Sequence, residues 1–191
     1  MSDTMRDALL FLIETLFNLY LFVLVVRMLL VWVRSDYYHP VTQFVVKMTD
    51  WIVQPMRRFL PNVKNIETST LLLIFLIEIV KFYLTFTISY GVPNIIGVVI
   101  LSLGDMLYLL VQTFMYAIIL QAVLSLMQAG SPVSFILYRI TAPILQPISR
   151  VMPKIGYIDL SPIPALIILQ LIKIVMINPI MQVGLGFALS Y

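Results

Sequence analysis

The sequence contains no cysteine and only one histidine, His39. Without thiols the chain cannot form disulfide bonds, thiolate metal sites, a cysteine nucleophile or the cysteine attachment of c-type haem. One histidine cannot supply a bis-histidine haem site, and no further metal ligands lie at suitable spacing from it. We therefore expect no metal site and no other cofactor.

Charged residues are also scarce. They make up 11% of the chain, against about 25% in an ordinary soluble domain. Hydrophobic residues make up 61%, and they gather in four long stretches, 8–33, 71–90, 95–126 and 163–189. Each stretch reaches the ~20 residues that a helix needs to cross a bilayer. The sequence therefore predicts an all-α integral membrane protein with about four transmembrane helices.

Two of these stretches contain residues that could interrupt a continuous helix. Gly97, Gly104 and Asp105 interrupt the third, which is either one tilted helix or a short interfacial piece followed by a span from about Met106. Pro179 in the fourth predicts a kink or an early exit. The first stretch has no basic segment or cleavage site before it, so we expect a retained span instead of a signal peptide.

Basic residues lie almost entirely on one side of the predicted spans. The loops after the first and third spans hold eight of them: Arg34, Lys47, Arg57, Arg58, Lys64, Arg139, Arg150 and Lys154. The other side has Arg6 alone. The positive-inside rule then predicts that both basic loops are cytoplasmic and that both termini are external.

An internal repeat is the strongest pattern in the sequence. Shifting the chain by 92 residues aligns 40–81 with 132–173 without a gap, and the identical positions include Pro40, Thr49, Ile52, Gln54, Pro55, Arg58, Pro61, Ile66, Ser69 and Lys81 with their counterparts. Each unit holds two spans, so the two repeats must be parallel. We assign 1–90, with spans at about 8–33 and 71–90, to the first repeat. The second repeat is 91–191, with spans at about 105–127 and 162–185.

Each repeat also contains a short amphipathic segment, at about 41–54 and 133–146. In the first, Phe44, Val45, Met48 and Ile52 share one helical face. These segments predict helices that lie in the plane of the cytoplasmic interface. Each should end at its Gln-Pro step, and Ser161 should cap the following span.

The residues between these segments and the next spans resemble the duplicated motif of the bacterial YggT family, T-D-P-h-h-x-P-h-R-R-h-h-P, where h is apolar. The motif aligns with 49–61 and 141–153, and 159–162 is similar to the family's D-h-S-P step. The departures are Trp51 for proline in the first copy, Ala142 for Asp and Ser149 for Arg in the second, and Glu67 and Thr70 in place of Asp159 and Pro162. Only the first copy keeps both motif arginines, Arg57 and Arg58. If this pair matters for function, the first repeat should contribute more to that function than the second.

The resemblance implies an inner-membrane protein linked to osmotic or extracytoplasmic stress tolerance. Plastid relatives are associated with cytochrome b maturation and nucleoid organisation. Arg57, Arg58 and Arg150 are expected to face anionic lipid head groups or a protein partner. We expect no nucleic acid to bind directly, and a protein partner or a homo-oligomer alongside the lipids.

Several charged residues fall inside the predicted spans. Arg27 is close enough to the end of its span to snorkel to the surface. Lys81 and Lys173 are each roughly 15 Å deep and are expected to share a polar centre between the repeats. The residues proposed for this centre are Glu14, Glu78, Lys81, Gln170 and Lys173.

Two functions remain open at this point. The first is a non-enzymatic scaffold or assembly factor of the cell envelope. The alternative is a small transporter or channel for a cation or proton that uses the midplane charges. No paired carboxylates, nucleophile with base or phosphate-binding loop lies at workable spacing, so we do not expect an enzyme.

Overall fold

The protein is entirely helical over the residues that the computed structural model describes, 3–35, 38–58, 60, 67–127, 131–151 and 159–190. The helices are α1 (Asp3–Trp32), α2 (Pro40–Arg57), α3 (Thr68–Ser89), α4 (Ile95–Leu126), α5 (Pro132–Ser149), α6 (Pro162–Ile172), the π-helix η1 (Lys173–Ile177) and α7 (Asn178–Leu189). Within this part of the chain, α1, α3, α4 and the continuous run Pro162–Leu189 are long and apolar enough to cross a membrane. The all-helical fold class and the four apolar helices long enough to cross a membrane are thus confirmed.

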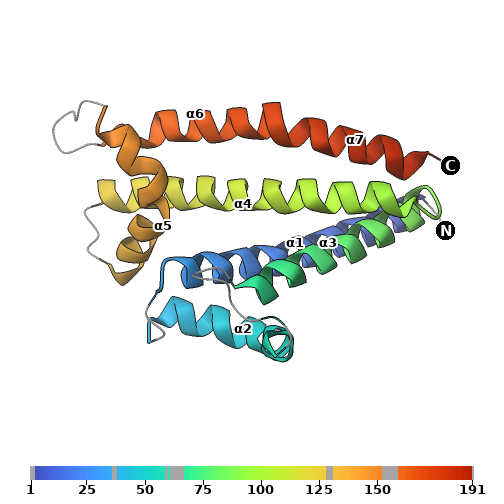
Figure 1. Ribbon diagram of the computed structural model, residues 1–191, viewed down its shortest axis with the longest axis horizontal. Coiled ribbons are helices and arrows are strands. Elements are labelled where there is room, and N and C mark those ends of the chain that lie inside the picture. Colours follow the sequence, from blue (N-terminus) through green and yellow to red (C-terminus); the bar gives the residue numbers. More distant parts are fainter. Residues whose placement is uncertain are drawn as a thin grey trace.

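The long helices run side by side along one axis (Figure 1). In this view α4 lies between α6–α7 on one side and α1 with α3 on the other, and α4 packs against α1, α3, α6 and α7. The N- and C-terminal ends lie together at one end of the molecule. At the opposite end α5 runs across the ends of α4 and α6, and α2 lies beside α1.

The shorter helices extend beyond the predicted boundaries. Both α2 and α5 continue through their Gln-Pro steps, and end at Arg57 and Ser149. The prediction that they stop before Pro55 and Pro147 is therefore wrong. Each proline lies in the last turn, so one lost hydrogen bond is tolerated there. At its start α2 is capped by His39, whose Nδ1 accepts from the Val41 amide at 3.2 Å.

The main core lies between α1 and the helices that surround it. Leu21, Leu24 and Val25 of α1 are almost completely buried. They belong to one apolar cluster with residues of α2, α3, α4 and α5. Ile136 of α5 belongs to this cluster, so the second repeat contributes to the core around α1.

The glycines of the third stretch are packing positions. Helix α4 is continuous from Ile95, so 95–104 belongs to the same helix as the rest of the predicted span. A Cβ atom at Gly97 would lie 2.1 Å from the backbone nitrogen of Ala188, and one at Gly184 would lie 2.9 Å from Leu101. The backbones of α4 and α7 can approach this closely only because small residues lie between them, as in many membrane helix pairs.

Pro179 does not end the last span. The five-residue π-helix η1 immediately precedes α7, and the amide of Asn178 bonds to the carbonyl of Lys173. This wider turn accommodates the missing N–H of the proline, so the helical run reaches Leu189. Lys173, one of the predicted site residues, is the first residue of this π-helix.

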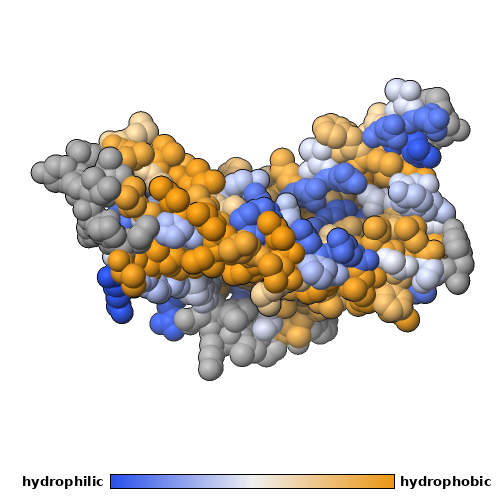
Figure 2. All heavy atoms as spheres, turned by 90° about the horizontal axis from the view of Figure 1, so that it is seen from above, coloured by the Kyte–Doolittle hydropathy of each residue, from blue (hydrophilic) through white to orange (hydrophobic). Residues whose placement is uncertain are grey.

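Many large apolar side chains are exposed. Figure 2 shows hydrophobic residues over much of the face seen from above and hydrophilic residues gathered near its middle and at one end. The middle of a membrane-spanning bundle is a costly place for polar groups, so the charged residues there need a structural account.

The close contact between α4 and α7 gives a direct test of the fold. We expect Gly97→Ala to destabilise the protein by about 1–3 kcal/mol, because even one methyl group overlaps the α7 backbone. Gly186→Ala is the matched control, since no atom lies within 4 Å of its added Cβ. Thermal unfolding in detergent measures both, and equal melting temperatures for the two variants would contradict the packing.

Candidate functional site: two buried ionic clusters

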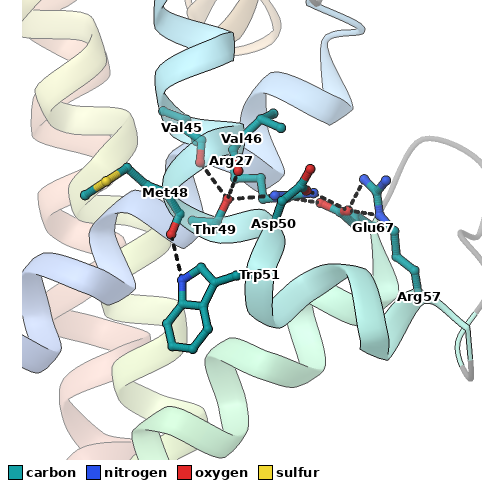
Figure 3. A network of polar contacts seen from close by, with 9 residues as sticks. All are labelled: Arg27, Val45, Val46, Met48, Thr49, Asp50, Trp51, Arg57 and Glu67. Carbon is teal, nitrogen blue, oxygen red and sulfur yellow. Dashed lines mark hydrogen bonds and ion pairs between the residues drawn. The ribbon is translucent and has the colours of Figure 1, made fainter.

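The first cluster, called here the α2 cluster, consists of Arg27, Thr49, Asp50, Arg57 and Glu67 (Figure 3). Arg27 Nε donates to Glu67 Oε2 at 2.9 Å, and Nη2 donates to Oε1 at 3.2 Å. Arg27 Nη1 donates to Thr49 Oγ1 at 2.6 Å, and Nη2 lies 2.7 Å from Asp50 Oδ1. The guanidinium of α1 is thus bound to α2 and to the start of α3.

Glu67 lies between two guanidinium groups (Figure 3). Its side chain is fully buried, and Arg57 Nε donates to its Oε1 at 2.5 Å. Burial alone would raise the pKa of Glu67, but hydrogen bonds from Arg27 and Arg57 and the charge of Arg27 hold the pKa below its usual value. Glu67 therefore carries its charge at neutral pH.

Arg27 does not snorkel to the surface as the sequence suggested. Its side chain is only 2% exposed, because Glu67, Thr49 and Asp50 provide an internal binding site for the guanidinium. An isolated charge would be expelled toward water, whereas a charge with this many partners can remain buried. The sequence signal that could have found this site is the pairing of one arginine with one acidic residue at the ends of neighbouring apolar stretches.

The second cluster, called the Lys81 cluster, lies within the spans and consists of Asn18, Glu78, Lys81 and Asp105. Lys81 Nζ lies 2.6 Å from Glu78 Oε2 on the same helix. It donates to Asp105 Oδ2 at 2.5 Å and to Asn18 Oδ1 at 3.0 Å. Neither oxygen of Glu78 accepts a well-aligned hydrogen bond from a described residue, so Glu78 and Lys81 form an ion pair without a hydrogen bond of good geometry.

Asp105 therefore has a definite role. The sequence suggested that it marks a boundary or soft point of the third stretch, but it lies inside α4 and binds Lys81 of α3. This ion pair connects the first repeat to the second. Two carboxylates around one ammonium group leave the cluster with one excess negative charge when all three groups are ionised.

Lys173 has different partners from Lys81. Its Nζ donates to Gln112 Oε1 at 2.5 Å and lies 4.0 Å from the centre of the Tyr108 ring. Among the described residues no carboxylate pairs with it. Its partner Gln112 is seven residues from Asp105 on α4, which is about 10 Å along the helix.

The remaining predicted site residues lie on the surface. Glu14 and Gln170 are exposed, and neither has a described contact with the two lysines. Arg58 and Arg150 are exposed as well. Arg57 is partly exposed but binds Glu67, so it belongs to the α2 cluster.

Comparison with known proteins shows which family has this architecture. A sequence profile of the CCB3/YggT family matches residues 6–88 and 100–180. The chain belongs to the CCB3/YggT family. A relative from Haemophilus influenzae is 38% identical over 169 residues, which cover 87% of this chain and 90% of the relative. Escherichia coli K12 YggT is 32% identical over 168 residues, covering 87% and 88%.

A third CCB3/YggT relative, from Pseudomonas aeruginosa, is 34% identical over 178 residues, covering 91% of this chain and 90% of the relative. All three are described as uncharacterised proteins. No solved structure matches the chain.

The YggT-like motif can now be related to the α2 cluster. In the first repeat the motif residues Thr49, Asp50 and Arg57 all contact Arg27 or Glu67. In the second repeat the corresponding residues are Thr141, Ala142 and Ser149, so both charged positions, those of Asp50 and Arg57, have no charge. The closing prolines of the motif, Pro61 and Pro153, lie outside the described residues.

The importance of Glu67 can be tested by removing only its charge. We expect Glu67→Gln to destabilise the protein by about 3–5 kcal/mol, because Arg27 remains buried without its main counter-ion. Asp50→Asn should cost only about 0–1 kcal/mol, since the Asp50 side chain is 40% exposed. Denaturation in detergent at neutral pH measures the difference.

The pH dependence of the stability of the wild type and of Glu67→Gln provides the control. A carboxylate whose pKa is lowered by folding stabilises the native state above its ordinary value of 4.5, and this contribution disappears as the pH falls through the lowered value. The wild type should therefore lose stability on acidification below about pH 4.5, and Glu67→Gln should lose less. An identical acid dependence in both would show that Glu67 is not the titrating group.

The two intramembrane lysines should respond in opposite ways to removal of their charge. Lys81→Met leaves Glu78 and Asp105 buried without a cation, and should cost about 3–5 kcal/mol. Lys173→Met removes a charge that no described carboxylate balances, and the insertion cost of such a charge is about 2.5–3.5 kcal/mol, so the change should be neutral or stabilising. Melting temperatures in detergent compare the two variants, and a larger loss for Lys173→Met would overturn this assignment of roles.

Proposed function

We propose that this CCB3/YggT-family protein is a non-enzymatic scaffold or assembly factor of the bacterial inner membrane, with a role in osmotic or extracytoplasmic stress tolerance. The observation that supports it best is a row of exposed apolar side chains on α2. Phe44, Met48 and Trp51 are 61%, 45% and 71% exposed and lie on one helical face. The α2 cluster holds the opposite side of this helix in place.

The proposal includes an orientation in the membrane. Both chain ends lie at one end of the molecule, and α2 and α5 lie at the other (Figure 1). The exposed basic residues Arg58, Arg139 and Arg150 are associated with α2 and α5. We therefore infer two parallel repeats whose in-plane helices face the cytoplasm, with both termini external.

Helix α2 is proposed to be the docking helix because α5 differs from it. Phe44 and Met48 correspond to Ile136 and Ile140 in the second repeat. The two isoleucines are buried in the core around α1, whereas Phe44 and Met48 are exposed. The two amphipathic helices are similar in sequence but differ in role: α5 packs in the core, whereas α2 is available for contact with lipid or a partner.

The chemistry around this apolar row suits the edge of a membrane. Lys47 and Arg58 are exposed on or next to α2. Aromatic residues flanked by basic side chains favour the boundary between acyl chains and anionic head groups. A partner protein would meet the same surface from the cytoplasmic side.

Cation or proton transport is the second candidate function, and one specific observation favours it. The Lys81 cluster places three oxygen-bearing side chains around one ammonium group inside the bundle, and the Asp105 side chain is 21% exposed. A net negative group at this depth would attract a proton or a small cation. The cluster also connects the two repeats, as a site in a small transporter would.

Experiments in cells and in vesicles separate the two functions. We expect the double change Phe44→Ser and Trp51→Ser to abolish growth after osmotic upshift in cells that lack the wild-type copy, while the protein remains folded. Phe135→Ser on α5 is the matched control, because Phe135 is an exposed aromatic residue of the other repeat. A photo-crosslinking amino acid at position 51 should give a discrete adduct with one cytoplasmic or membrane protein.

Purified protein in liposomes should show no proton or cation flux. Flux that Glu78→Gln abolishes would contradict the scaffold and support the transporter. Normal stress tolerance of the α2 variant would equally contradict the proposed role of this surface.

A further inference from the structure

The second repeat contains a cavity beside Asp159, the residue that corresponds to Glu67 of the α2 cluster. The cavity has a volume of about 80 Å³ and is lined by Gln121, Ala122, Ser125, Leu126, Leu145, Asp159 and Pro162. It lies between the end of α4, helix α5 and the start of α6. In the first repeat, the corresponding ends of α1, α2 and α3 enclose the α2 cluster.

Two of the residues that bind Arg27 have oxygen-bearing counterparts in the second repeat, whereas the third, Asp50, corresponds to Ala142. Asp159 occupies the position of Glu67 in the repeat, and Thr141 occupies the position of Thr49. In the first repeat Arg27 donates to both acceptors. In the second repeat Thr141 Oγ1 donates to Gln121 Oε1, so Gln121 of α4 contacts the threonine that Arg27 of α1 contacts in the first repeat.

The second repeat lacks the guanidinium. At the offset of 92, Ile119 stands for Arg27, and its side chain is 46% exposed. Ser149 stands for Arg57. Among the described residues Asp159 has no basic partner, and one of its oxygens accepts only the Ser161 amide, at 2.9 Å.

We propose that this cavity binds the guanidinium of an arginine side chain supplied by a partner protein. The acceptors are the exposed Asp159 carboxylate, the exposed Ser125 hydroxyl and the Gln121 amide oxygen, which also accepts from Thr141. In the first repeat two carboxylates and a hydroxyl bind Arg27. A water molecule needs only about 10–15 Å³ of such volume, so a cavity of about 80 Å³ is large enough for a guanidinium group. The inference deepens the scaffold proposal and rests on it for the existence of a partner.

Planar carboxylate recognition favours arginine over other cations. A guanidinium can donate to a carboxylate and to neighbouring acceptors at the same time, as Arg27 does. The cavity is at the same end of the molecule as the exposed row of α2, so one partner could contact both surfaces.

Methylguanidinium, which reproduces the end of an arginine side chain, is the probe for the purified protein. At low millimolar concentration it should raise the melting temperature by about 2–4 °C relative to the same concentration of tetramethylammonium, which has no N–H donor. Asp159→Asn should abolish this rise. The asparagine keeps an oxygen acceptor for the Ser161 amide, so the start of α6 is preserved.

A second variant tests the site without relying on the first. Gln121→Arg places a guanidinium on α4 next to Thr141, as Arg27 is placed next to Thr49. It should raise the melting temperature without any ligand and remove the response to methylguanidinium. A full response in either variant would overturn the proposal.

Other occupants give different results. Stabilisation by phosphatidylethanolamine vesicles but not by methylguanidinium would identify a lipid ammonium group and overturn the arginine assignment. If methylguanidinium raised the melting temperature only of Lys154→Gln, the occupant would be the Lys154 ammonium group of this chain, and the proposal would be overturned. Lys154 lies outside the described residues. Because these measurements need no partner, they can fail while crosslinking at position 51 succeeds, and the reverse also holds.

Discussion

The ion pair between Arg27 and Glu67 is the constraint on which the arrangement of the first repeat depends. Two fully or nearly fully buried charges are costly to remove from water, so they persist only where further partners satisfy their remaining donors and acceptors. Thr49, Asp50 and Arg57 provide those partners from α2. The position of α2 is therefore coupled to a charge in α1 and to a charge at the start of α3.

This coupling explains why the two repeats can share a fold and differ in surface. In the first repeat charged residues fix α2, so its outward face does not have to contribute to the core. In the second repeat Ala142 and Ser149 replace charged motif residues, and α5 is fixed by burial of Ile136 and Ile140. Phe44 and Met48, which α2 exposes, thus correspond to Ile136 and Ile140, which α5 buries in the core.

Much of the architecture could be predicted from the sequence because long apolar stretches and a repeat with identical prolines have few structural interpretations. The four spans and the positions of the two short helices follow from them. The partners of Arg27 and Asp105 could not be predicted in this way, because hydropathy places a residue along its own helix and says nothing about rotation toward its neighbours. The Gly97 contact with α7 was hidden for the same reason: a glycine that breaks a stretch and a glycine that admits another backbone look alike in one sequence.

The two ionic clusters also place different demands on a function. In the α2 cluster both acidic residues are matched by guanidinium groups, so its charges balance and its geometry is fixed. The Lys81 cluster has two carboxylates for one ammonium group, and Lys173 has an amide and an aromatic ring instead of a carboxylate. The charges of Glu78, Lys81, Asp105 and Lys173 sum to zero, but no described carboxylate pairs with Lys173, so this balance does not consist of direct ion pairs alone. Transport would require this balance to be broken in a controlled way, whereas a scaffold requires only that it persist.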